Sequence, residues 1–141
     1  MLREIFIDTA AWLALFDPRD TNHVLANTTY KSLLPRYTRI ITTNVVVLET
    51  YTLLYRRTNY NTALKFLTNS AGIKKLTKLY SDEDLETRAE SILRRYNDQD
   101  FSFVDAVSFA VMEDLNITTA FTFDHHFLIA GFTLAQASGR Q

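Results

Sequence analysis

Four acidic residues of this chain lie inside strongly apolar segments, where an ionised side chain is costly to bury. They are Asp8 in Ile-Phe-Ile-Asp-Thr, Glu49 in Val-Val-Val-Leu-Glu-Thr, Asp105 in Phe-Val-Asp-Ala-Val and Asp124 in Phe-Thr-Phe-Asp. A carboxylate in such a segment usually shares a cation, a hydrogen-bond donor or a proton with a neighbouring group. The other acids lie in polar or loop-like segments. The contrast predicts that these four share a metal site.

The residue types favour one class of metal ion. The chain has no cysteine, so the ligands would be oxygen or nitrogen atoms, and carboxylate-rich sites favour hard divalent cations such as Mg²⁺ or Mn²⁺. These ions keep several water ligands and bind phosphate oxygens, which predicts phosphodiester hydrolysis. In this interpretation the metal activates a water and stabilises the transition state, while the carboxylates mainly hold the metal.

Three of the four acids also have a purely structural interpretation. Asp105 comes three residues after Ser102, which is the spacing of a helix capping box. Asp8 and Asp124 could each cap the turn that follows. Glu49 lies too far into its helix to form a capping box, and its neighbours are apolar. The chain's own residues therefore support Glu49 best, and the structural interpretation is strongest for Asp105.

Short β-rich segments alternate with helical segments along the chain, which predicts an α/β domain with a mainly parallel sheet of about five strands. The expected strands are residues 4–8, 39–42, 73–79, 119–123 and 132–135. The expected helical segments are residues 10–16, 21–34, 45–57 after an N-cap at Asn44, 61–71, a helix opened by a Ser81–Asp84 capping box, and 102–115.

These elements place the four acids at one edge of the sheet. Asp8 and Asp124 follow the last residues of their strands, and open parallel sheets bind ligands outside the carboxyl ends of the strands. Glu49 and Asp105 lie in the first turns of helices that enter from loops. We therefore expect all four carboxylates to converge on one crevice.

Length and composition predict one domain, residues 1–141, with 47% hydrophobic residues available for a single core. The apolar N-terminal segment is interrupted by Arg3, Glu4 and Asp8, so we expect neither a secretory signal nor a membrane span. A cytoplasmic location is the default expectation.

The net charge of −1 offers no global electrostatic footprint for nucleic acid or for an anionic membrane. Any contact with a phosphate backbone must come from a local group of basic residues, and each such group could equally be a solvated surface. The local groups are Arg56 with Arg57, Lys74 and Lys75 with Lys78, and Arg94 with Arg95.

The ordered set of acidic motifs resembles the PIN-domain nucleases, and especially the VapC-like toxin ribonucleases of bacterial toxin–antitoxin systems. The motifs are Ile-Asp-Thr near the N-terminus, Glu49 after Thr-Thr-Asn, Ser-Phe-Val-Asp-Ala, and Phe-Thr-Phe-Asp-His-His-Phe. The acids are 41, 56 and 19 positions apart, which suits the family. No single motif is specific, but the ordered set covers most of the chain.

The resemblance implies a compact three-layer α/β/α sandwich that cleaves RNA endonucleolytically with Mg²⁺ or Mn²⁺. It implies that Asp8 and Asp105 are the main direct metal ligands. Thr9 and Ser102 would orient carboxylates or metal-bound waters. The family's catalytic and metal-binding positions are taken by Asp8, Glu49, Asp105 and Asp124.

The resemblance also implies partners: an RNA substrate, a cognate antitoxin protein and a second copy of the chain in a homodimer.

Adjacent histidines point apart and do not readily share one ion, so we assign His125 and His126 no metal role and at most a contact with substrate. Two alternatives stay open. One is a PIN-domain RNA-processing nuclease without an antitoxin, and the other is a non-catalytic scaffold that binds RNA or protein.

Overall fold

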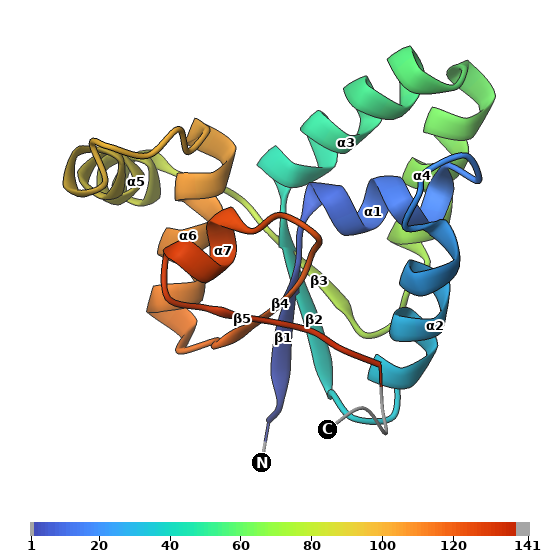
Figure 1. Cartoon of the computed structure of the whole chain (residues 1–141), viewed down its shortest axis with the longest axis horizontal. Coiled ribbons are helices and arrows are strands. Elements are labelled where there is room, and N and C mark those ends of the chain that lie inside the picture. The colour runs from blue at the N-terminus through green and yellow to red at the C-terminus, as the bar shows by residue number, and fades with distance from the viewer. Residues whose placement is uncertain (1, 138–141) are drawn as a thin grey trace.

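A five-stranded parallel sheet lies between two layers of helices in the computed structural model, which describes residues 2–137 (Figure 1). The strands pair in the order β3-β2-β1-β4-β5, and every pair is parallel. This confirms the predicted α/β/α sandwich. The strands are β1 (Glu4–Ile7), β2 (Arg39–Thr43), β3 (Leu76–Leu79), β4 (Thr119–Phe121) and β5 (Thr133–Leu134).

Seven helices within residues 2–137 cover the two faces of the sheet (Figure 1). None of these helices is long and apolar enough to cross a membrane. One layer contains α1 (Thr9–Phe16), α2 (His23–Leu33), α3 (Asn44–Arg57) and α4 (Tyr60–Ala71). The other contains α5 (Glu83–Arg95), α6 (Phe103–Leu115) and α7 (His126–Ile129).

The central strand explains why the apolar segments of this chain are continuous rather than alternating. Ile5, Phe6 and Ile7 of β1 are each at most 1% exposed. A parallel strand covered by helices on both faces needs apolar side chains at every position. Helix α6 follows the same rule, since eight of its thirteen residues are buried. The sheet and α6 therefore form the rigid support of the acidic residues.

The strand order changes direction at β1. The chain runs from β1 to β2 and β3 on one side, and later returns to β4 and β5 on the other. Connections that leave β1 and β4 therefore diverge, and ligands of open α/β sheets bind at such a point. Asp8 follows β1 directly, and Asp124 is the third residue after β4. The topology thus brings these two acids to the edge that the sequence predicted.

Helix α3 is capped by a different residue from the one predicted. Thr43 is the N-cap, since its Oγ1 accepts a hydrogen bond from the Val46 backbone N–H at 3.1 Å. Asn44 was predicted in this role, but its Oδ1 accepts a hydrogen bond from the Ser81 backbone N–H at 2.9 Å instead. Asn44 therefore ties the start of α3 to the segment that follows β3.

The start of α5 also differs from the prediction. Asp82 is the N-cap and accepts a hydrogen bond from the Leu85 backbone N–H at 2.8 Å, so the expected Ser81–Asp84 capping box is wrong. The Ser81 hydroxyl donates to Glu86 Oε2 at 2.9 Å. An aspartate one residue later competes with the serine as a cap, because both residue types are favoured at that position.

Three further differences concern the bounds of two strands and one additional helix. Strand β3 begins at Leu76 rather than residue 73, because the Ile73 carbonyl accepts the Leu76 N–H in a turn. Strand β4 ends at Phe121, two residues early, which leaves Thr122 free for the site. The short helix α7 was not predicted. It is followed by Gly131, whose φ of 99° is one that glycine adopts readily.

Candidate functional site

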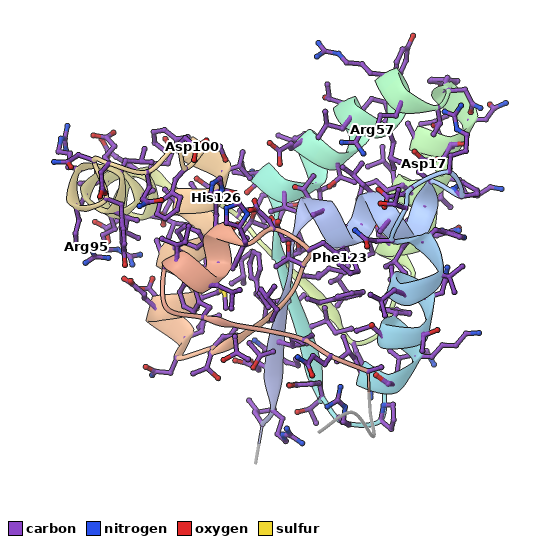
Figure 2. All side chains as sticks on the ribbon, in the orientation of Figure 1. Asp17, Arg57, Arg95, Asp100, Phe123 and His126 are labelled. Atoms are coloured by element: carbon purple, nitrogen blue, oxygen red, sulfur yellow. The ribbon has the colours of Figure 1, made fainter. Side chains whose placement is uncertain are left out.

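All four predicted acids line one cavity of about 280 Å³ at the carboxyl edge of the sheet. Within residues 2–137 its lining includes neither lysine nor arginine. Figure 2 shows His126 and Asp100 close together on the α5–α7 side of this edge. The lining residues are Asp8, Thr9, Ala10, Leu13, Glu49, Leu53, Asp100, Ser102, Asp105, Asp124 and His126.

Asp8 is held by a threonine from the neighbouring strand connection. Its side chain is buried, and its Oδ2 accepts a hydrogen bond from Thr122 Oγ1 at 3.1 Å. The same hydroxyl oxygen accepts the Asp124 backbone N–H at 3.1 Å, so Thr122 joins the ends of β1 and β4. The Asp8 side chain does not cap α1, although Asp8 occupies the N-cap position. The alternative of Asp8 as a simple helix cap is therefore wrong.

Asp105 has both of the roles that the sequence left open. The Ser102 Oγ accepts the Asp105 backbone N–H at 3.0 Å, and Asp105 Oδ2 accepts the Ser102 backbone N–H at 3.0 Å. This is the complete capping box. The same carboxylate lines the cavity. Ser102 thus orients Asp105 through its backbone amide, while its hydroxyl stabilises the first turn of α6.

Glu49 and Asp124 are each held by one short hydrogen bond. Glu49 Oε1 accepts the Thr9 hydroxyl at 2.7 Å, so Thr9 orients a carboxylate from α3 rather than its neighbour in sequence. Asp124 Oδ1 accepts the His126 backbone N–H at 2.9 Å in the turn that opens α7. Each of the four carboxylates is therefore held by a hydrogen bond, and its oxygens keep acceptor capacity for a ligand in the cavity.

Burial and mutual repulsion change the protonation of two of these acids. Burial raises the pKa of Asp8 to about 7, and the charges of Asp105 and Asp124 add to this rise against hydrogen bonds from Thr9 and Thr122. Burial also raises the pKa of Asp105, and Asp124 adds to that rise. Carboxylates that repel one another, in a cavity whose described lining has no lysine or arginine, fit a bound cation, since oxygen ligands of this kind suit Mg²⁺ or Mn²⁺.

Asp100 and His126 belong to this cavity, but sequence reasoning assigned neither to it. His126 Nε2 lies 2.9 Å from Asp100 Oδ1, and Nδ1 lies 3.4 Å from Asp105 Oδ2 and 3.3 Å from Asp124 Oδ1. Burial lowers the pKa of His126, but the charges of Asp124, Asp100 and Asp105 outweigh it, so the pKa is raised.

The rings of His125 and His126 do not point apart, since their centroids are 4.9 Å from each other. Of the two, only His126 lines the cavity, which agrees with the expectation that they do not share one ion. The sequence signal for His126 was its position two residues after Asp124, which suits an aspartate turn at the start of a short helix.

Two of the other twelve acids are not simply solvent-exposed, although their sequence surroundings are polar. Asp100 lines the cavity, and Asp17 is 5% exposed.

The basic groups do not line the cavity, and several have other partners. Lys75 directly precedes β3 and therefore lies at the opposite edge of the sheet. Its Nζ donates hydrogen bonds to the carbonyls of Leu34 and Tyr37. Arg94 and Arg95 lie in α5, where they pair with Glu90 at 3.6 Å and Glu113 at 3.2 Å. Figure 2 shows Arg95 below α5 in this view, away from Asp100 and His126.

Arg56 and Arg57 lie closer to the cavity in the fold. Leu53 and Arg56 are four and seven positions after Glu49, so the three residues share one stripe of α3. Glu49 and Leu53 line the cavity, and the stripe continues from them to Arg56. Arg57 pairs with Asp20 at 3.7 Å. The last turn of α3 is therefore the basic surface that follows on from the acidic crevice.

Comparisons with known proteins identify the family. The PIN-domain profile matches residues 5–132. The 23S rRNA-specific endonuclease VapC20 of Mycobacterium tuberculosis is 38% identical over 131 residues, which are 91% of this chain and 95% of that protein. The crystal structure of M. tuberculosis VapC20, described as a sarcin-ricin loop cleaving toxin, has a TM-score of 0.87 at 35% identity and covers 94% of this chain and 98% of that one.

More distant structures share the fold alone. VapBC2 from Rickettsia felis, bound to a DNA fragment from its promoter, has a TM-score of 0.68 at 11% identity and covers 93% of this chain and 96% of that one. PAE2754 from Pyrobaculum aerophilum has a TM-score of 0.64 at 17% identity, covering 95% and 90%. The sheet order, the acid-lined edge and the matched profile agree with the resemblance seen in the sequence. This chain belongs to the PIN-domain family and is similar to the VapC toxins.

Proposed function

We propose that this protein is a Mg²⁺- or Mn²⁺-dependent endoribonuclease of the VapC type, which hydrolyses phosphodiester bonds of RNA. One observation carries the proposal: four carboxylates from four separate segments line one cavity without a lysine or arginine in its described lining. Burial, with a smaller contribution from the charges of Asp105 and Asp124, raises the pKa of Asp8 to about 7, and a bound cation would offset this cost. We also propose that residues 1–141 form one domain, which the family match over residues 5–132 supports.

The carboxylates would divide the work of holding the metal. The charges of Asp105 and Asp124 act on Asp8, and these three carboxylates would bind the ion directly. Glu49 reaches the same cavity from α3 and would bind the ion or one of its waters. A divalent ion held there would lower the pKa of water and offset the negative charge that develops on the phosphate. Hydrogen bonds from Thr9, Thr122 and Ser102 fix the carboxylates before substrate binds.

The RNA backbone would run along the last turn of α3. Arg56 extends the stripe of Glu49 and Leu53 beyond the cavity, and we propose that Arg56 contacts phosphate, with Arg57 beside it. Lys74 and Lys75 precede β3 at the other edge of the sheet. Arg94 and Arg95 pair with glutamates. We therefore centre the proposed RNA surface on Arg56 and Arg57, and an RNA contact of these four residues stays a prediction.

The proposed substrate is ribosomal RNA. This follows from the relative named as a 23S rRNA-specific endonuclease, which matches 91% of this chain at 38% identity. We further propose that the protein acts in the cytoplasm, where that substrate is, that a cognate antitoxin inhibits it, and that it forms a homodimer. The structure from Rickettsia felis is of a VapBC protein, which supports the antitoxin.

Cleavage of defined RNA tests the proposal. Purified protein is incubated with ribosomes and with a sarcin–ricin-loop oligonucleotide in Mg²⁺, in Mn²⁺ and with EDTA, and new 5′ ends are mapped by primer extension. We expect cleavage with either metal and none with EDTA. Asp105→Asn should abolish cleavage, because an amide keeps the capping hydrogen bond but loses the charge. Asp98→Asn, an exposed substitution two residues before Asp100, is the control.

Each alternative predicts a different result. RNA binding without metal and without turnover would favour the scaffold and contradict the nuclease proposal. Full activity of Asp105→Asn would contradict the assignment of the site. Cleavage that no product of a neighbouring small reading frame inhibits would favour an RNA-processing nuclease without an antitoxin.

A further inference from the structure

One ring nitrogen of His126 faces two of the proposed metal ligands without a hydrogen-bond partner. Nδ1 is 3.4 Å from Asp105 Oδ2 and 3.3 Å from Asp124 Oδ1, and it is buried although the side chain as a whole is 16% exposed. Nδ1 makes no hydrogen bond to any of residues 2–137. Buried polar atoms nearly always have a partner, and in the neutral ring a cation shared with the two carboxylates would provide one for this nitrogen.

The rest of the ring is held in place from two sides. Asp100 Oδ1 lies 2.9 Å from Nε2, and the Phe101 ring packs edge-on against the imidazole with centroids 5.2 Å apart and planes at 70°. Histidines that bind metals usually donate their other N–H to a carboxylate, which fixes the tautomer and the ring orientation. In the neutral tautomer with the proton on Nε2, Nε2 donates to Asp100 and the lone pair of Nδ1 faces Asp105 and Asp124.

The donor atoms are close enough for one cation. Ligand atoms of Asp105, Asp124 and His126 all lie within 4.8 Å of one another. The two distances from Nδ1 are 3.3 and 3.4 Å. Neighbouring ligands in an octahedral shell with bonds of about 2.1 Å are roughly 3 Å apart. Small adjustments of these side chains would therefore suffice to bind an ion.

We infer that His126 is a nitrogen ligand of the metal, positioned by Asp100, and that it shifts the preference of the site toward Mn²⁺ relative to Mg²⁺. The inference rests on the metal site of the proposed function and deepens it, because four carboxylates alone would form an all-oxygen site. Mg²⁺ takes oxygen ligands and loses its waters reluctantly, whereas imidazole suits transition-metal ions. Asp100 is a positioning residue, with its own side chain 94% exposed.

Pulsed electron paramagnetic resonance of bound Mn²⁺ tests the ligand directly. The full-length chain is stripped of metal, loaded with one equivalent of Mn²⁺ at pH 8, and its spectrum is examined for ¹⁴N coupling from a coordinated imidazole. We expect this coupling in the wild type and in His125→Ala, and its loss in His126→Ala. His125→Ala is a matched control, because its ring neighbours His126 but does not line the cavity.

Competition between Mn²⁺ and Mg²⁺ gives a second measurement that does not depend on cleavage. Free Mn²⁺ is followed while Mg²⁺ is added, which yields the ratio of the two affinities. We expect His126→Ala to lower the Mn²⁺/Mg²⁺ affinity ratio about tenfold, and Asp100→Ala to lower it by a smaller factor. Asp98→Ala should leave the ratio unchanged. Circular dichroism confirms that each variant is folded.

The outcomes separate this inference from the proposed function. Mn²⁺ binding without ¹⁴N coupling in the wild type, or an unchanged ratio in His126→Ala, overturns the inference and leaves a carboxylate-only nuclease. A wild-type chain that binds neither ion overturns both. Nitrogen coupling that disappears only in His126→Ala, together with the altered ratio, supports the assignment whether or not the chosen RNA is cleaved.

Discussion

The two ends of helix α1 hold two buried acids in opposite surroundings. Asp8 precedes the helix and Asp17 follows it, and they are 3% and 5% exposed. Asp17 Oδ1 accepts the Arg19 backbone N–H at 3.0 Å and lies 3.8 Å from the Arg19 guanidinium. The charges that act on Asp8 are those of Asp105 and Asp124. Burial is therefore similar at the two ends, and only the compensation differs.

The comparison shows which property marks a metal site. Around Asp17 the chain supplies its own cations, because Arg57 also pairs with Asp20 at 3.7 Å. Figure 2 shows Asp17 and Arg57 in the same region, away from His126. Around Asp8 the described lining of the cavity has no lysine or arginine, and the charged neighbours of Asp8 are the carboxylates of Asp105 and Asp124. An acid whose burial is balanced within the protein is structural, whereas one that is left unbalanced calls for a ligand.

The largest expected difference between the two acids is in catalysis. Asp8→Asn should lower the rate of RNA cleavage by about 10²–10³-fold or more, the scale of removing a group that stabilises the transition state. Asp17→Asn should stay within about twofold of the wild type, once activity is corrected for the folded fraction. Single-turnover cleavage at saturating Mn²⁺ measures both. Equal losses in the two variants would remove the distinction.

The second difference is in stabilisation by metal. Mn²⁺ at one hundred times its Kd should stabilise the wild type by about 2.7 kcal/mol, because only the folded state has the site. For a chain of this size that is a rise in Tm of about 5–10 °C. Asp17→Asn should show the same rise, and Asp8→Asn little or none. Differential scanning fluorimetry with and without Mn²⁺ measures it, and a full response of Asp8→Asn would exclude Asp8 as a ligand.

The third difference is in the pH dependence of stability without metal. The pKa of Asp8 is raised from 3.8 to about 7 in the folded state, so the folded chain binds this proton more tightly than the unfolded chain. Stability is therefore lost as pH rises from about 4 to about 7, and the loss is complete above that range. Asp8→Asn removes the penalty.

Melting curves in EDTA at pH 4 and pH 8 test this sign. The Tm of Asp8→Asn should differ little from that of the wild type at pH 4 and should exceed it by a few degrees at pH 8. Asp17→Asn should lower the Tm at pH 8, because it weakens a compensated charge. A lower Tm for Asp8→Asn at pH 8 would show that the Asp8 carboxylate is already balanced.

The smallest expected effect concerns RNA binding beyond the crevice. Arg56→Gln should raise KM about threefold without changing the Tm or the metal affinity, since one exposed phosphate contact is worth less than about 1 kcal/mol. Arg95→Gln is the matched control, because this arginine of α5 lies away from His126 in Figure 2 and pairs with Glu113 of α6. Steady-state kinetics on the oligonucleotide measure both. Equal effects would place the RNA path elsewhere.

Much of the fold could be predicted because its signals are local. Continuous apolar segments mark strands and helices that are covered on all sides, and the buried β1 and α6 follow that pattern. The capping box of Ser102 and Asp105 was also readable, since both of its hydrogen bonds join residues three positions apart. The caps of α3 and α5 were misplaced by one residue, because neighbouring Thr, Asn, Ser and Asp side chains compete for the same amides.

The site was predictable only in part. Four acids in apolar segments were visible from residue types, and a parallel sheet implied that they meet. Asp100 was missed because its surroundings in sequence are polar, and its contact with His126 spans 26 positions. Thr122 lies between two phenylalanines and was missed because its partner Asp8 is 114 positions away. Partners at such distances depend on which strands are neighbours, and no local pattern reports that.

The sequence by itself determined which residues are apolar, which elements form and which acids are costly to bury. These properties follow from side-chain chemistry and from the repeat of each element, and they hold before the chain folds. Only the tertiary structure decided which distant charges surround Asp8. Asp17 is paired with Arg19, two residues away in the sequence, whereas the carboxylates that act on Asp8 are those of Asp105 and Asp124. The order of the strands brings these two distant acids to Asp8, and no local pattern reports that order.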